Sequence, residues 1–358
     1  MDRESLMRLA YDIGFQTVRL ARVRPTPRAD VLDRWLARGR QADMHWFARQ
    51  RETRRDPRAR APWARTAMVL AVRHHHRRPA DPGGRTGLVA RYAWGRDYHN
   101  VMGKRLRKLV RRLREAGVRA WGGVDTAPIQ ERSWAAAAGL GFTGKHTLQI
   151  EVGTTSWMLL GVVMIDLPLE PDAPIERDHC GSCRRCLTIC PTDAFPAAYE
   201  LDARRCIAFW TIESRGVVPR ALRSAFGRWV FGCDLCQEVC PHNHDPPDSD
   251  EDAFAPRHAW LDLDAIVLRP DAQLLEDFIG TPLRRPGAEG LKRNALIALG
   301  NLGDDDAVDA VRVALDHPSP IVRGTAVWTL GQLGAPIPVQ DPNPIVQDEI
   351  DAVSSARP

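Results

Sequence analysis

Hydrophobic and polar residues alternate in blocks from position 1 to position 170, and the length of each block predicts its secondary structure. Two apolar runs, 66–73 (TAMVLAVR) and 156–169 (SWMLLGVVMIDLPL), have the length of buried strands. Residues 98–117 place leucine and valine every three or four positions among lysine and arginine. This spacing indicates a long amphipathic helix that ends at a glycine. Residues 118–125 (VRAWGGVD) predict a further strand that runs into a turn.

The next stretch, 127–141 (APIQERSWAAAAGLG), is expected to be a helix with Pro128 near its first turn and glycines at its end. Strands therefore alternate with helices along residues 1–172. This order predicts an α/β (α+β) domain in which helices cover a sheet.

The pattern changes after a Pro- and Asp-rich loop, HNHDPPDSDEDAFAP, which marks a domain boundary. Two segments beyond it, 292–303 (KRNALIALGNLG) and 323–334 (RGTAVWTLGQLG), repeat the same pattern of basic, alanine, leucine and glycine positions. A repeat with this spacing predicts stacked helical pairs, so residues 249–335 are expected to form an α-helical HEAT-like domain. Residues 336–358, again rich in Pro and Asp, are expected to be a loosely ordered tail.

Composition places the chain among water-soluble globular proteins, with 44% hydrophobic and 27% charged residues. No apolar run is long enough to span a bilayer, and the start of the chain lacks the apolar segment of a signal peptide. We therefore expect a cytoplasmic protein without a membrane contact. Residues 1–120 hold 30 Lys and Arg against 11 Asp and Glu. Such an excess favours a polyanionic partner, although a genome rich in arginine codons would also place arginine on solvated faces.

All eight cysteines lie between positions 180 and 240, four of them in the run HCGSCRRCLTICP. In a reducing compartment such a group indicates metal binding rather than disulfides. The spacing C-x2-C-x2-C-x3-C-P is that of bacterial ferredoxins, whose fourth cysteine ligates the other cluster. This rule predicts two 4Fe–4S clusters, one bound by Cys180, Cys183, Cys186 and Cys240, the other by Cys190, Cys206, Cys233 and Cys236.

A zinc site is the alternative interpretation, because two C-x2-C pairs can hold one zinc ion. Zinc sites do not require a third cysteine two residues further on, nor a C-x3-C-P ending in both halves. Residues 173–248 are therefore predicted to be a ferredoxin-like domain, inserted between the α/β and the helical domains. Such clusters transfer one electron at a time. They are therefore expected to deliver electrons to a further redox centre in the α/β domain.

Several motifs together resemble the epoxyqueuosine reductase family from about residue 5 to residue 335. They are ARYAWGRDYHNVMGKRL, VDTAPIQERSWAAAAGLGFTGKHT, LDARRCIAFWTIESRG, FGCDLCQEVCPHN and GLKRNALIALGNLG, with the cysteine run. The resemblance implies an oxidoreductase that reduces the epoxide of epoxyqueuosine, at the wobble position of tRNA, to the alkene of queuosine. It also implies two 4Fe–4S clusters, a base-off cobalamin in the N-terminal domain, and a helical end that helps to hold tRNA.

Asp125 is the candidate proton donor that this resemblance implies. It ends a predicted strand before a helix, where functional groups often lie, and burial against an apolar macrocycle would raise its pKa. As an alternative, it simply caps the following helix. The same resemblance nominates Gln149, Ala208, Glu213 and Asp234 as cobalamin contacts and Arg215 as a tRNA contact. His99, at a predicted helix start, is expected to be structural.

Three positions depart from the family pattern. His146 replaces an asparagine in the usual Gly-Lys-Asn-Thr, Ala208 replaces a serine, and His242-Asn243 stands where Trp-Asn is frequent. Their effect on individual cofactor contacts is open.

Two other functions are compatible with parts of the chain. A corrinoid reductive dehalogenase of small molecules has similar parts, but it usually carries a twin-arginine export signal that is not seen here. A ferredoxin-like carrier fused to a repeat module would need neither corrinoid nor Asp125. For the reductase we expect a monomer and an electron donor of the flavodoxin or ferredoxin type.

Overall fold

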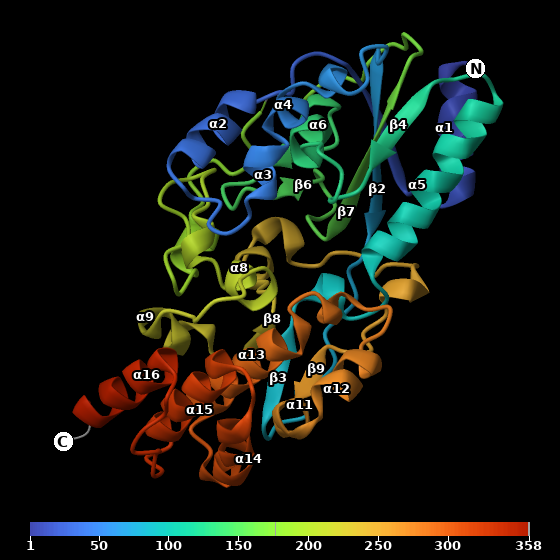
Figure 1. The fold of residues 1–358 in the computed structure, drawn as a ribbon. Coiled ribbons are helices and arrows are strands. Elements are labelled where there is room, and N and C mark those ends of the chain that lie inside the picture. Colours follow the sequence, from blue (N-terminus) through green and yellow to red (C-terminus); the bar gives the residue numbers. More distant parts are fainter. Residues whose placement is uncertain (176, 357–358) are drawn as a thin grey trace. The chain divides into compact units, whose positions relative to one another are not determined.

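The computed structural model describes residues 1–175 and 177–356, which form two compact units (Figure 1). Each unit is assembled from three separate stretches of chain. The first unit comprises Met1–Arg77, Arg96–Arg204 and Leu235–Ala255, and the second comprises Arg78–Gly95, Arg205–Asp234 and Pro256–Pro358. The cysteine-rich range 173–248 therefore contributes to both units, and the module boundaries predicted from the sequence remain a proposal.

A four-stranded sheet in the order β1-β2-β7-β4 forms the centre of the first unit, and all its ladders are antiparallel. Strand β2 covers the predicted range and is buried over nearly its whole length, as its continuous apolar sequence requires. The edge strand β1 was not predicted from the sequence, because two arginines interrupt its apolar residues. The strands are β1 (Thr17–Arg22), β2 (Thr66–Arg73), β4 (Ala120–Gly123) and β7 (Met158–Ile165).

Helices cover both faces of this sheet. Helices α1 (Arg3–Ile13) and α5 (Tyr98–Glu115) share one hydrophobic core with it, and α6 (Glu131–Ala137) contributes to the core on the other face (Figure 1). Helix α5 buries its leucines and exposes its cations, as the spacing predicts. Helix α6 begins later than expected, because residues 124–130 form a loop that includes Pro128.

Short elements complete the first unit. A two-stranded hairpin pairs β5 (Phe142–Thr143) with β6 (Gln149–Ile150), and α6 packs against both strands. The remaining helices of this unit are α2 (Ala29–Ala37), α3 (Trp46–Arg49), α4 (Arg51–Arg55), α7 (Arg185–Thr188) and α10 (Leu235–Glu238). Among the residues that the structure describes, no helix of either unit is long and apolar enough to cross a membrane.

The second unit joins a three-stranded sheet to stacked helices. The sheet has the order β8-β3-β9, and the two repeated segments form the ends of α13 and α15, which pack against each other. Gly300 of the first repeat must be small, since a Cβ there would lie 2.7 Å from the Trp328 ring of the second. The elements are β3 (Thr86–Val89), α8 (Ile207–Ile212), α9 (Arg220–Arg223), β8 (Trp229–Phe231), β9 (Trp260–Asp262), α11 (Leu263–Leu268), α12 (Asp271–Asp277), α13 (Gly287–Leu302), α14 (Val308–Val313) and α15 (Pro320–Gln332).

The expectation of a loosely ordered tail after residue 335 is wrong for most of that segment. Residues Pro344–Ser355 form helix α16, which begins at the N-cap Asn343 and packs Val346, Ile350 and Val353 against Val327. Apolar residues at helical spacing, together with an Asn-Pro start, outweigh the polar composition. Residues 357–358 of the predicted tail lie outside the described residues.

A buried ion pair fixes α16 to the rest of the unit. The Glu349 carboxylate accepts two hydrogen bonds from Arg223, at 3.0 and 2.9 Å, and a third from Arg220 at 2.9 Å. The Arg223 guanidinium also lies over the Trp328 ring, 5.3 Å from its centroid.

We predict that Glu349→Ala destabilises the second unit by about 3–5 kcal/mol, because it leaves the buried Arg223 charge without a partner. Asp348→Ala is the matched control. It removes an exposed partner of Arg220 and should cost less than about 1 kcal/mol. Urea unfolding, monitored by tryptophan fluorescence, measures the free energy of unfolding of both variants. Equal losses of that free energy in the two variants would contradict this role of the pair.

Candidate active site and cluster ligands

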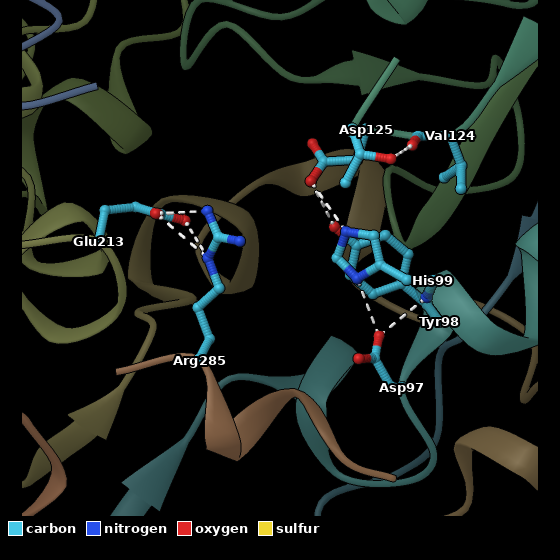
Figure 2. A network of polar contacts seen from close by, with 8 residues as sticks. Asp97, Tyr98, His99, Val124, Asp125, Glu213 and Arg285 are labelled. Atoms are coloured by element: carbon cyan, nitrogen blue, oxygen red, sulfur yellow. Dashed lines mark hydrogen bonds and ion pairs between the residues drawn. The ribbon is translucent and has the colours of Figure 1, made fainter. Parts of the chain in front are cut away.

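Asp125 lies in the loop that follows β4, in a conformation that is unusual for a residue with a side chain. Its φ angle is 47°, in the left-handed region. The carboxylate is 63% exposed and accepts hydrogen bonds from Tyr98 Oη at 3.0 Å and His99 Nε2 at 3.1 Å (Figure 2). Both donors come from the first turn of α5. A strained backbone position at the end of a strand is typical of functional sites.

His99 lies between two carboxylates. Its Nδ1 contacts Asp97 Oδ1 at 2.9 Å, while Nε2 contacts Asp125 (Figure 2). Burial by itself would lower the pKa of His99, but the hydrogen bonds and charges of Asp125 and Asp97 outweigh burial and raise it to about 9. The imidazole is therefore charged at neutral pH. The sequence predicts a proton on a buried Asp125; in the structure the Asp125 side chain is mostly exposed, and the raised pKa is that of the adjacent His99.

A second carboxyl group lies close to Asp125. Burial raises the pKa of Glu131, at the start of α6, to about 7, and the nearby charge of Asp125 acts in the same direction. The positive charge of Arg54 opposes the shift. Glu131, Tyr98 and His99 were not predicted as functional residues. For Tyr98 and His99 the sequence holds a signal, an Asp-x-His at the start of a long helix.

Four of the predicted cluster ligands converge within the first unit. Burial raises the pKa of the Cys186 thiol to about 11, and the neighbouring thiols of Cys180, Cys240 and Cys183 act in the same direction. Cys240, 54 positions after Cys186 in the sequence, thus joins the first three cysteines. Helices α7 and α10, which carry or precede these residues, pack against each other. This is the set that the ferredoxin spacing assigns to one cluster.

The second predicted set is divided between the units. Cys190 and Cys236 belong to the first unit, and Cys206 and Cys233 belong to the second. All eight cysteines are free thiols. Within the described ranges, no three His, Cys, Asp or Glu side chains are grouped tightly enough to hold a single metal ion. The structure thus shows thiols brought together rather than a finished coordination sphere.

Buried polar atoms without partners occur in the same unit as Asp125. Gln149 is buried, and its amide nitrogen donates to Leu140 O at 2.9 Å, but its Oε1 has no partner among the residues that the structure describes. The indole nitrogen of the buried Trp134 on α6 is also unpartnered. Unpaired buried polar atoms are costly, so these residues fit a bound group that carries both hydrogen-bond donors and acceptors. A corrinoid with its peripheral amides has this chemistry.

The other predicted contacts lie in the second unit, where each has protein partners. The Glu213 carboxylate pairs with Arg285 at 2.8 Å (Figure 2). Asp234, only 3% exposed, accepts the Arg91 backbone N–H at 2.7 Å. Arg215 donates to Ile212 O at 3.0 Å and to Arg285 O. Ala208 is partly buried beside the core of this unit. Arg285 was not found from the sequence.

Comparison with known proteins covers nearly the whole chain. Family models match three ranges: "Epoxyqueuosine reductase QueG, DUF1730" matches 54–126, "4Fe-4S double cluster binding domain" matches 179–243, and "HEAT repeats" matches 283–348. The chain is 40% identical over 343 residues to the epoxyqueuosine reductase of Xanthomonas campestris, covering 91% of this chain and 94% of that protein. The identity to the epoxyqueuosine reductase of Pseudomonas aeruginosa is 37% over 345 residues, covering 92% of this chain and 94% of that protein.

Solved structures agree with the sequence comparison. A selenomethionine-labelled epoxyqueuosine reductase superposes with a TM-score of 0.89 at 27% identity, over 99% of this chain and 98% of that chain. The structure of an epoxyqueuosine reductase with an epoxyqueuosine-modified tRNA-Tyr stem loop gives a TM-score of 0.85 at 28% identity. The superposition covers 99% of this chain and 94% of that chain. These likenesses confirm an N-terminal α/β domain, a double-cluster domain and C-terminal HEAT repeats. The chain belongs to the epoxyqueuosine reductase family.

Proposed function

We propose that this protein reduces the epoxide of epoxyqueuosine in the anticodon of tRNA to the alkene of queuosine, using cobalamin and two 4Fe–4S clusters. Family membership over about nine tenths of the chain supports the reaction. The observation that carries the proposal is that one folded unit holds four convergent thiols and the charged His99–Asp125 pair. Reduction of an epoxide to an alkene and water consumes two electrons and two protons, so a redox centre and a proton source are both needed.

The residues present fit the proposed cofactors. The cysteine thiols are the ligands that 4Fe–4S clusters use, and Gln149 Oε1 and Trp134 Nε1 offer unpaired hydrogen-bonding atoms to a corrinoid. When bound, cobalamin would supply the reducing chemistry for the epoxide, and the clusters would return electrons to the cobalamin one at a time. Ala208, Glu213 and Asp234 remain proposed contacts of this cofactor.

The proton comes, in this proposal, from the pair that the protein itself builds. His99 holds a proton at neutral pH and passes it through the Asp125 carboxylate, 3.1 Å away, to the epoxide oxygen as the C–O bond breaks. Tyr98 holds the same carboxylate in position, because its hydroxyl donates a hydrogen bond to Asp125 at 3.0 Å. Glu131, with a pKa of about 7, is a nearby source for the second proton.

Binding of tRNA is proposed to use the basic N-terminal part. Helix α5 presents Lys104, Arg107, Lys108 and Arg111 on its exposed side, and such cations supply salt-dependent affinity for phosphates. Arg215 is proposed as a further phosphate contact, although it donates to two backbone carbonyls of the protein. A flavodoxin- or ferredoxin-type electron donor and a monomeric state belong to the same proposal.

Asp125→Asn is predicted to lower the rate of queuosine formation at least about 100-fold, because the carboxylate that delivers the proton is lost. The assay uses anaerobically reconstituted protein, cobalamin and tRNA that contains epoxyqueuosine. Iron content and corrinoid binding should stay unchanged. Asp43→Asn, at an exposed position, is the control and should keep full activity. Normal turnover of Asp125→Asn with intact clusters would remove Asp125 from this role.

A pH profile tests the part of His99. Because its pKa is raised from 6.5 to about 9, the charged form persists through neutral pH and is lost as the pH rises through about 9. We predict that kcat/KM for the tRNA falls above that pH, and that His99→Gln lowers the rate and removes this alkaline limb. An alkaline limb that persists unchanged in His99→Gln would show that another group titrates.

A further inference from the structure

The turn of the β5–β6 hairpin holds His146 in one orientation. Two backbone hydrogen bonds close this turn, from Gly144 N–H to Leu148 O and from Thr147 N–H to Gly144 O, both at 2.8 Å. Thr147 has a φ of 71°, which turns the chain back on itself. The His146 side chain is only 2% exposed. The hairpin thus presents a buried imidazole at a fixed position.

The hydrogen bonding of His146 fixes where its ring proton lies. Leu148 N–H donates to His146 Nδ1 at 3.1 Å, so Nδ1 carries the lone pair and Nε2 carries the proton. Burial lowers the pKa of His146 to about 4, and the charges of Arg132 and His242 act in the same direction. The ring is therefore neutral at physiological pH, with a single N–H donor at Nε2.

This donor has no partner in the protein. His146 Nε2 is fully buried and makes no hydrogen bond to any described residue. Two further buried atoms make no hydrogen bond to a described residue. They are Gln149 Oε1, on strand β6 of the hairpin, and Trp134 Nε1, on helix α6, which packs against the hairpin. Leaving a buried donor or acceptor unpaired costs about 1–3 kcal/mol, so these three atoms, with Glu131 Oε1 on α6 as a fourth, indicate a ligand that pairs with them.

The chemistry of the three atoms narrows the class of ligand. Two are donors that need an acceptor, and one is an acceptor that needs a donor. A primary amide offers both, whereas an iron–sulfur cluster offers acceptors alone. A cobalt ion is a poor match for His146, because a ligating Nε2 must be free of its proton.

We propose that His146 Nε2–H donates a hydrogen bond to a peripheral amide carbonyl of the bound corrinoid. This inference rests on the proposed function, since it needs cobalamin in the first unit. An asparagine at this position would offer a likewise uncharged N–H donor. His146 is thus a cofactor-binding residue and not a structural one.

The test is a spectral titration of anaerobically reconstituted protein with cob(II)alamin. His146→Leu should bind it about tenfold more weakly than wild type, the loss of roughly one hydrogen bond. His146→Asn, which restores a donor, should stay within about threefold of wild type. His45→Leu changes an exposed histidine of the same unit and should bind as wild type does. Because the donor is neutral, the ratio of the wild-type and His146→Leu affinities should stay constant between pH 6 and 9.

Gly144→Ala provides a second variant should His146→Leu lose its clusters or fail to fold. A Cβ at Gly144 would lie 2.7 Å from Ile150 Cδ1 and 2.9 Å from His146 Cε1, so it crowds the ring against Ile150 while the imidazole remains. It should also weaken binding. Circular dichroism and iron content check the fold of every variant.

Each contrary result overturns a different statement. Equal affinity of His146→Leu and wild type would overturn the inference and leave the proposed function intact. Nitrogen splitting in the cob(II)alamin electron paramagnetic resonance spectrum that disappears in His146→Leu would make His146 a cobalt ligand, against the inference. A wild-type protein with full clusters that binds no corrinoid would overturn both the inference and the cobalamin part of the proposed function.

Discussion

The convergence of four thiols in a partly buried site is the constraint on which the rest of the first unit depends. Burial and mutual repulsion raise the pKa of the Cys186 thiol to about 11, so the protein alone does not favour four thiolates side by side. Bound metal cations would offset that cost. The loops that carry Cys180 and Cys240 have little regular structure of their own, and they pack against the elements around them.

The β5–β6 hairpin is one of those surrounding elements. Phe142 and Ile150 of the hairpin form a small hydrophobic cluster with Cys180 and Cys240. Lys145, from the turn, donates to Cys183 O at 2.9 Å and so ties the turn to the cysteine loop. The same turn carries the buried His146, so one short hairpin contacts the predicted cluster loop and presents an unpaired donor for the proposed corrinoid.

The sequence predicted those features that depend on short-range spacing. The strand at 66–73, the long helix from 98 and the repeated helical segments follow from periodicity, and the cysteine set that converges in the first unit follows from ligand spacing. The second cysteine set stays a prediction. Strand β1 and helix α16 were missed, because arginines and prolines obscure segments whose order comes from burial against distant residues. His99 was judged structural, since nothing local shows that Asp125, 26 positions later, lies against its ring.

Metal analysis of anaerobically purified protein tests the central claim most directly, because every later step needs iron–sulfur chemistry. The account predicts about eight iron and about eight acid-labile sulfide per chain, two clusters of four each. Stoichiometric zinc, with neither iron nor sulfide after anaerobic reconstitution, would contradict it.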